Sequence, residues 1–346
     1  MSAKPPISIL TPVWNGLPYI KECIESVFSQ DFTDWELIIS DNGSTDGTRD
    51  YLDTLDDPRV QFFKQEKNLG IDGNLNFLLS KASAPIIYYL CADDYFYPGA
   101  LRKVMESWEQ ADPKTALIGF NWKEVLKHSE LANYSYRVLP KQLDPLTATF
   151  AFFLFGNLPG NLSNVSARPE ILRASGGFDE SYRQAGDFEI WSRIAKDHPI
   201  ILSDTETAFV RRHDGVATKY MNTRGTQFAE HLAIYEPLIN QLSPYVDRKK
   251  LLTYFNIEIA SYHLRDAIKY ALHGRFARTR SFLDTKSSIC WPKWKQVTLC
   301  LPFALYEGGR SKFIIRMARE IMSLADKKEE PVKNALNVNT SQQQST

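Results

Sequence analysis

The stretch that decides the fold reads WELIISDNGSTD and runs from Trp35 to Asp46. Its first part is a mainly apolar run, typical of a strand buried in a parallel sheet. Its second part combines Asp, Asn, Gly and Ser, the residues that form turns. A second apolar run, Ile86 to Leu90, is likewise followed by two acids, Asp93 and Asp94. Because open α/β sheets bind ligands outside the carboxyl ends of their strands, the sequence predicts a binding site with several acidic groups at that edge.

Apolar runs and helical patterns alternate over the first 120 residues. From Ile20 to Phe28, for example, apolar residues recur at spacings of three and four, as on the buried face of a helix. The predicted strands are Ile7–Val13, Trp35–Ser40, Val60–Lys64, Ile86–Leu90 and Thr115–Phe120. Further predicted helices lie near Thr48–Leu55, Gly70–Ser80 and Pro98–Gln110. This order predicts an α/β fold with a mainly parallel central sheet and helices on both faces.

The order changes beyond Phe120. Helices are predicted at residues 145–155 and 187–196, with short strands at 164–167 and 208–212. From Asn222 onward nearly all patterns are helical, including Leu251–Leu272 and Arg275–Leu283. The end is rich in Asn, Gln, Ser and Thr, which predicts disorder. We therefore expect an α/β domain over 1–220, a helical basic region over 221–325 and a disordered tail over 326–346.

Charge is distributed unevenly along an ordinary globular composition of 43% hydrophobic and 24% charged residues, which argues against a disordered chain and a multi-span membrane protein. Residues 1–247 carry 23 Lys and Arg against 33 Asp and Glu, whereas residues 248–319 carry 15 against 4. This basic region, with Trp and Lys interleaved from Trp291 to Lys295, predicts contact with an anionic membrane surface. A nucleic-acid partner or a merely solvated basic face are the alternatives, and we expect no nucleic acid.

The cysteines and the apolar runs indicate where in the cell the protein is located. Cys23, Cys91, Cys290 and Cys300 form no CxxC pair, and no apolar signal segment precedes the strand at Ile7. The apolar run from Val297 to Tyr306 is far shorter than the roughly 20 residues that cross a bilayer. We expect a cytoplasmic protein that is peripheral on the inner face of the cytoplasmic membrane.

Together these motifs resemble the family 2 glycosyltransferases over roughly residues 5–220. The matching segments are Thr11 to Gly16, Ser44 to Thr48, Asn68 to Gly70, Asp93-Asp94, Gly176 to Glu180, Gly186-Asp187 and Arg211 to His213. The resemblance implies the GT-A fold, with a nucleotide-binding half over 1–120 and an acceptor half over 121–220. It also implies a nucleoside diphosphate sugar donor of the UDP or dTDP type.

The resemblance places the nucleotide sugar near the first strand ends. Trp14 matches an aromatic that stacks on the base, and Asp41 with Asn42 would accept hydrogen bonds from base and ribose. The other expected donor-binding residues are Pro12, Asn15, Asn68 and Asp93. From the residues alone, Trp14 also fits a core aromatic and Asp41 also fits an Asx turn. Asn42 replaces the second acid of the family's loop.

Asp93 and Asp94 are the candidate ligands of a divalent cation, and the resemblance adds His213. Hard cations take carboxylate oxygens, and a cation here would offset charge on the departing diphosphate. Mg²⁺ and Mn²⁺ both fit this pair. Cys91 stands where the family has a further acid. A solvated acidic turn and a structural histidine are the alternative interpretations.

Asp187 is the candidate general base. It matches the Asp of the family's Glu-Asp motif, with Gly186 in place of the Glu, and it begins a predicted helix. Its carboxylate would take the proton of the acceptor hydroxyl as that oxygen attacks the anomeric carbon from the face opposite the diphosphate. An N-cap is the alternative role. Glu189 and Asn161, which ends the Gly-rich loop 156–161, are assigned to the acceptor side.

The sequence thus predicts a metal-dependent, inverting glycosyltransferase that acts on a hydroxyl of a glycan or lipid-linked glycan. A sugar-phosphate nucleotidyltransferase and an inactive sugar-nucleotide-binding protein are the alternatives. The chain has no GxGxxG after its first strand, no GxxxxGK[ST] and no GxSxG. Dinucleotide-binding Rossmann domains, P-loop kinases and α/β-hydrolases are therefore excluded.

Overall fold

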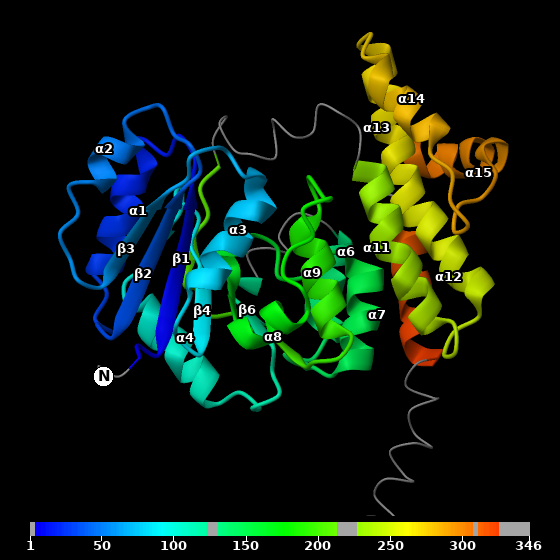
Figure 1. The fold of residues 1–346 in the computed structure, drawn as a ribbon. Coiled ribbons are helices and arrows are strands. Elements are labelled where there is room, and N and C mark those ends of the chain that lie inside the picture. The colour runs from blue at the N-terminus through cyan, green and yellow to red at the C-terminus, as the bar shows by residue number, and fades with distance from the viewer. Residues whose placement is uncertain (1–3, 123–129, 213–226, 307–310, 325–346) are drawn as a thin grey trace, which may run out of the picture. The chain divides into compact units, whose positions relative to one another are not determined.

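The computed structural model describes residues 4–122, 130–212, 227–306 and 311–324 (Figure 1). The chain divides into two compact units, residues 1–221 and 222–346, and each is described by itself. The predictions for His213 and for the tail over 326–346 lie outside the described residues.

An eight-stranded sheet forms the centre of the first unit, in the order β3-β2-β1-β4-β8-β6-β9-β7. These strands are β1 (Ile7–Val13), β2 (Trp35–Asp41), β3 (Val60–Lys64), β4 (Ile86–Tyr89), β6 (Leu117–Gly119), β7 (Gln142–Leu143), β8 (Val165–Ala167) and β9 (Ile200–Leu202). The four strands β3, β2, β1 and β4 run parallel, as do β6 and β9, whereas β7 and β8 run antiparallel to their neighbours. A separate small sheet pairs β5 (Tyr95–Phe96) with β10 (Ala208–Phe209). The predicted mainly parallel sheet is confirmed.

Helices cover both faces of the sheet because successive strand residues point to opposite sides. On one face, Ile7, Ile9 and Val13 of β1 share a core with the buried side chains of α1 (Tyr19–Phe28) and α4 (Ala100–Glu109). On the other face lies α3 (Gly70–Lys81), where the amide oxygen of Asn74 accepts a hydrogen bond from the hydroxyl of Ser40 at 2.6 Å. Both faces are thus covered, which explains why β1 and β2 are almost wholly buried.

Among the described residues of this unit, the other α-helices are α2 (Thr48–Leu52), α6 (Glu130–Val138), α7 (Pro145–Phe155), α8 (Pro169–Ala174) and α9 (Gly186–Ala195). Helix α7 begins where the Asp144 carboxylate accepts the N–H groups of Leu146 and Thr147, both at 3.0 Å, with Pro145 at its first position. It is buried around most of its circumference, and α9 packs against it. This packing fixes the helix that carries Asp187.

The described part of the second unit is helical. Its elements are α11 (Gln227–Leu242), α12 (Arg248–Phe255), a π-helical turn (Asn256–Ala260), α13 (Ser261–Leu272), α14 (Phe276–Asp284), α15 (Lys293–Leu305) and a helix over 311–324. The buried amide of Asn256 holds the segment before α15, since it donates to the Ile289 carbonyl and accepts from the Trp291 N–H, both at 3.0 Å. In the described ranges, no helix combines the length and the hydropathy needed to cross a bilayer. The predicted C-terminal helical region is confirmed.

Candidate active site

The loops that follow β1 and β2 are held together by side-chain to backbone hydrogen bonds. The Asn15 N–H donates to Ser44 Oγ at 2.7 Å, and the Thr45 N–H donates to Asn15 Oδ1 at 2.8 Å. The Leu17 N–H donates to the carboxylate of Asp46 at 3.0 Å. Asn15 itself has a φ of +51°, a left-handed conformation that asparagine tolerates better than most residues. The first loop therefore has a fixed shape.

This fixed loop presents Trp14 to solvent. The side chain is 59% exposed, so it is not a core aromatic. Pro12, two residues earlier, is still within β1 and lies opposite Ser40 of β2. An exposed indole directly after a buried parallel strand is available for stacking on a planar ligand group.

Asp41 is completely buried at the end of β2. Its carboxylate forms an ion pair with Arg49 and accepts the N–H groups of Gly43 at 3.3 Å and Ser44 at 3.1 Å. These last two contacts make the turn that the Asp-Asn-Gly sequence favours. Asp41 thus shapes the loop, and the guanidinium of Arg49, a partner that sequence reasoning missed, offsets its charge.

Asn42 joins this loop to the segment that follows β3. Its amide nitrogen donates to the carbonyl of Gly70 at 2.9 Å and to Asn68 Oδ1 at 3.2 Å, and its amide oxygen accepts the Leu69 N–H at 2.7 Å. An aspartate could not donate the first two bonds. Asparagine at position 42, where the family has an acid, is therefore explained by the two acceptors in the loop that contains Asn68.

Replacing Asn42 by Asp should destabilise the fold. Asn42 is 5% exposed, so the new carboxylate would face the Gly70 carbonyl and Asn68 Oδ1 without donors for them. We expect a loss of about 1–3 kcal/mol in the free energy of unfolding, measured by urea denaturation. Asn133→Asp, at an exposed position on α6, is the matched control and should change stability little. Equal stability of both variants would refute this role for Asn42.

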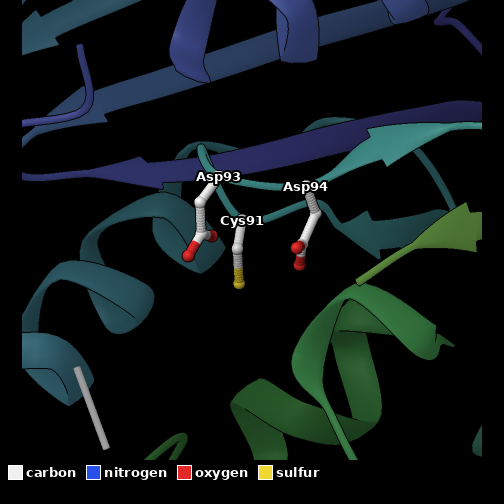
Figure 2. Close-up of side chains that lie close together, drawn as sticks. All are labelled: Cys91, Asp93 and Asp94. Atoms are coloured by element: carbon white, nitrogen blue, oxygen red, sulfur yellow. The ribbon is translucent and has the colours of Figure 1, made fainter. Parts of the chain in front are cut away.

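An acidic cluster follows β4. One donor atom each from Cys91, Asp93 and Asp94 lies within 4.8 Å of the others. Figure 2 shows the three side chains projecting from one loop in the same direction. The turn is closed by the Asp94 N–H, which donates to the Cys91 carbonyl at 3.0 Å. The cluster was predicted for the two aspartates, and the structure adds the sulfur beside them.

Burial and mutual repulsion dominate the electrostatics of the cluster. The pKa of Asp94 is raised to about 7. Burial is the larger cause, and the negative charge of Asp93 is the smaller one. Burial and the same two carboxylates also raise the pKa of the Cys91 thiol. Convergent carboxylates fit a hard divalent cation such as Mg²⁺ or Mn²⁺, whereas a thiol is a soft ligand. The donor set therefore fits a cation bound mainly through Asp93 and Asp94.

Arg211 secures the cluster from a distant part of the chain. Its backbone N–H donates to Asp94 Oδ1 at 2.8 Å, and its Nε donates to the Asp93 carbonyl at 2.9 Å. Its guanidinium also pairs with Glu22 and lies 4.9 Å from the centre of the Tyr19 ring. The Arg211 to His213 motif was predicted to approach this site, and Arg211 does so through both its backbone N–H and its side chain.

Asp187 lies in the first turn of α9, after the cap residue Ala185, so it is not the N-cap. One carboxylate oxygen accepts the Phe188 N–H at 2.8 Å, and the other accepts the amide of Asn157 at 2.8 Å. Burial raises the pKa of Asp187 to about 6, although both hydrogen bonds act in the opposite direction. A carboxylate with such a pKa can act as a general base near neutral pH. Asn157 is a partner that the sequence reasoning did not identify.

Helix α3 holds the segment that leads to Asp187. The side chain of Asn76 brackets Phe178, accepting its N–H and donating to its carbonyl, both at 2.8 Å. Farther along, an added Cβ at Gly186 would come within 2.8 Å of a carboxylate oxygen of Asp72. The carboxylate of Asp72 therefore occupies the space that a side chain at position 186 would need. This explains the glycine that replaces the family's Glu.

Gly186→Ala should destabilise the protein through this contact. Alanine favours a helix over glycine by about 1 kcal/mol, but overpacking typically costs 1–3 kcal/mol. We expect a net loss of about 1 kcal/mol in urea denaturation. In an Asp72→Ala background the same change should be neutral or stabilising, because the carboxylate is gone. Identical effects in both backgrounds would contradict the close contact.

Glu189 and Asn161, the two acceptor-side candidates, have internal contacts. Glu189 pairs with Arg193 at 2.6 Å, and Arg193 Nη2 donates to the Gly177 carbonyl at 2.7 Å, which fastens α9 to the preceding loop. Asn161 is exposed and accepts the Ser163 N–H at 2.8 Å, which caps a short 3₁₀ turn. Both residues therefore shape the backbone on either side of Asp187.

Comparison with known proteins agrees with this fold. Residues 8–157 match the sequence model of a family described as glycosyl transferase family 2. A Campylobacter jejuni GalNAc(5)-diNAcBac-PP-undecaprenol beta-1,3-glucosyltransferase is 35% identical over 105 residues, which are 30% of this chain and 34% of that protein.

Two solved structures have the same fold. Residues 1–349 of Staphylococcus aureus TarS in complex with UDP-GlcNAc superpose with a TM-score of 0.57 at 17% identity, covering 95% of this chain and 92% of that one. A mannosyltransferase of Pyrobaculum calidifontis in complex with GDP-Man and Mn²⁺ gives 0.52 at 18% identity, covering 95% and 88%. The α/β unit therefore has the GT-A fold of glycosyltransferases. Residues 8–157 of this chain are thus similar to glycosyl transferase family 2, and the named relatives are glycosyltransferases.

Proposed function

We propose that this protein transfers a sugar from a UDP- or dTDP-type donor to a hydroxyl of a glycan or lipid-linked glycan, with inversion. The loop of residues 157–163 carries the proposal. At its start, the Asn157 amide donates to the carboxylate of Asp187. At its end, the Ser163 hydroxyl accepts the Cys91 N–H of the acidic cluster at 2.9 Å. One short loop thus links the candidate base to the candidate metal ligands within one compact unit.

The donor would bind along the carboxyl ends of β1, β2 and β4. The exposed indole of Trp14 would stack on the base. Asn15 and Asn68 would bind the nucleotide, and Pro12 with the buried Asp41 and Asn42 would frame its pocket. Asp93 and Asp94, with His213, would hold Mg²⁺ or Mn²⁺, which supplies positive charge opposite the diphosphate.

Asp187 would act as the general base. Its carboxylate would accept the proton of the acceptor hydroxyl while that oxygen attacks the anomeric carbon, and the nucleoside diphosphate leaves from the opposite face. The Phe188 N–H and the Asn157 amide orient the carboxylate for this step. Asn161 and Glu189 would contribute to the acceptor side indirectly. Asn161 holds the loop, and Glu189 holds the helix, that would form it.

The acceptor and the location form a further part of the proposal. The name of the Campylobacter relative describes an undecaprenol-linked glycan as its substrate, which supports a lipid-linked acceptor here. Such acceptors require access to a membrane, so we place the protein in the cytoplasm on the inner face of the cytoplasmic membrane.

Removal of the Asp187 carboxylate should abolish transfer. We expect Asp187→Asn to lower kcat by about 10²–10⁴-fold, because the amide cannot accept the proton. Nucleoside diphosphate release from a panel of UDP- and dTDP-sugars, with lipid-linked acceptor extracts, is the measurement. Asp197→Asn, at an exposed position in the turn that follows α9, is the matched control and should retain activity. Full activity of Asp187→Asn would exclude this base, and release of pyrophosphate would indicate a nucleotidyltransferase.

The activity should depend on pH through the same group. Asp187 has a pKa of about 6 and works in its deprotonated form. The rate should therefore fall as pH drops below about 6 and level off above it. The measurement is kcat between pH 5 and 8 at saturating metal and substrates. A flat profile in wild type would contradict the assignment.

Transfer should require a divalent cation held by Asp93 and Asp94. We expect chelation to abolish activity and Asp93→Asn or Asp94→Asn to raise the Mn²⁺ concentration that gives half-maximal rate by at least tenfold, because each variant loses a charged ligand. Asp34→Asn, at an exposed position, is the control. Unchanged metal dependence in both cluster variants would refute the site.

A further inference from the structure

Exposed apolar side chains are concentrated in one stretch of the second unit. Of the twelve large hydrophobic residues that are prominently exposed in the described parts of the chain, eight lie between residues 272 and 306. They are Leu272, Phe276, Leu283, Trp294, Val297, Leu299, Leu305 and Tyr306. Exposed apolar groups mark an interaction surface only where they gather on one face, so the placement of these residues on their helices decides the matter.

Helix α15 has a buried side and an exposed side. Its buried residues Gln296, Cys300 and Ala304 recur every four positions and define the face that packs on the unit. At 100° per residue, Trp294 and Leu305 lie on the opposite face. These two side chains are 70% and 69% exposed. The outer face of α15 therefore presents a tryptophan and a leucine without a covering element among the described residues.

The same stretch is strongly basic. Residues 272–306 contain six Lys and Arg and a single acid, Asp284. Lys286 is exposed in the segment that precedes α15. Within α15, the ammonium group of Lys295 lies 4.6 Å from the centre of the ring of Trp291, which precedes the helix. Lysine and tryptophan beside exposed leucine is the composition of segments that lie in the interface of an anionic bilayer. Each basic residue near such a surface adds to the attraction.

We propose that residues 272–306 dock on the surface of an anionic phospholipid bilayer, with Trp294 and Leu305 of α15 inserted at the interface. This inference goes beyond the proposed reaction and stands whether or not transfer occurs. A nucleic-acid partner would use the basic residues but not the exposed leucines, because its phosphates attract charge. A second copy of the chain would match the apolar face but would meet the same positive charge.

Vesicle sedimentation with the full-length protein tests the proposal. We expect binding to vesicles of phosphatidylcholine with 30% phosphatidylglycerol and at least tenfold weaker binding to pure phosphatidylcholine. Trp294→Ser with Leu305→Ser should weaken binding at least tenfold. Lys286→Glu with Lys295→Glu should do so too, and should flatten the dependence on salt. Phe28→Ser, at a partly exposed aromatic of the first unit, should leave binding unchanged.

Several results would overturn the proposal. These are no binding by wild type, equal binding to both vesicles, or normal binding by both double variants. Self-association that is lost in Trp294→Ser with Leu305→Ser, or RNA binding that is lost with the lysines, would assign the surface to another partner. Thermal denaturation verifies folding, and the lysine variant tests the surface even if the apolar variant does not fold. Nucleoside diphosphate release by the same samples keeps this result separate from the catalytic proposal.

Discussion

The rest of the structure depends on the buried parallel pairing of β1 with β2 and β4. Val13 lies opposite Asp41 in one ladder, and Leu10 lies opposite Tyr89 in the other, so the three strands end at the same edge. Both faces of these strands are covered by helices, which leaves little freedom to shift the register without exposing apolar side chains. The candidate donor-binding residues lie at that edge, either in the last residues of β1 and β2 or in the loops that follow β1, β2, β3 and β4.

Polar side chains then convert the edge into a site of fixed geometry. Asn42 and Asn76 each use both ends of an amide to bind backbone groups of another segment. Buried networks of this kind are specific because each unmatched group would cost free energy. The same low-dielectric surroundings raise the pKa of Asp94 and of Asp187, with like charge adding to the effect only at Asp94. Exclusion of water therefore both makes the amide hydrogen bonds specific and raises the pKa values of the two carboxyl groups.

Much of the fold could be predicted from the sequence, and much less of the site. The runs at Ile7–Val13 and Trp35–Ser40 are long, apolar and bounded by turn residues, so their strands were predictable. The strands β7 and β9 were not predicted, although β8 and β10, which are as short, were predicted. The acidic cluster was found because its residues adjoin one another in the chain. The contacts of Asp72 with Gly186 and of Asn157 with Asp187 join positions 114 and 30 residues apart, and no local pattern signals them.

Inverting transfer with Asp187 as the single base is the central proposal for this protein. The most direct test is the anomeric configuration of the transferred sugar, measured by proton NMR on the product formed from whichever donor supports nucleoside diphosphate release. We expect the configuration opposite to that of the donor, because the acceptor oxygen attacks from the face away from the diphosphate. Retention of the donor's configuration would contradict the account.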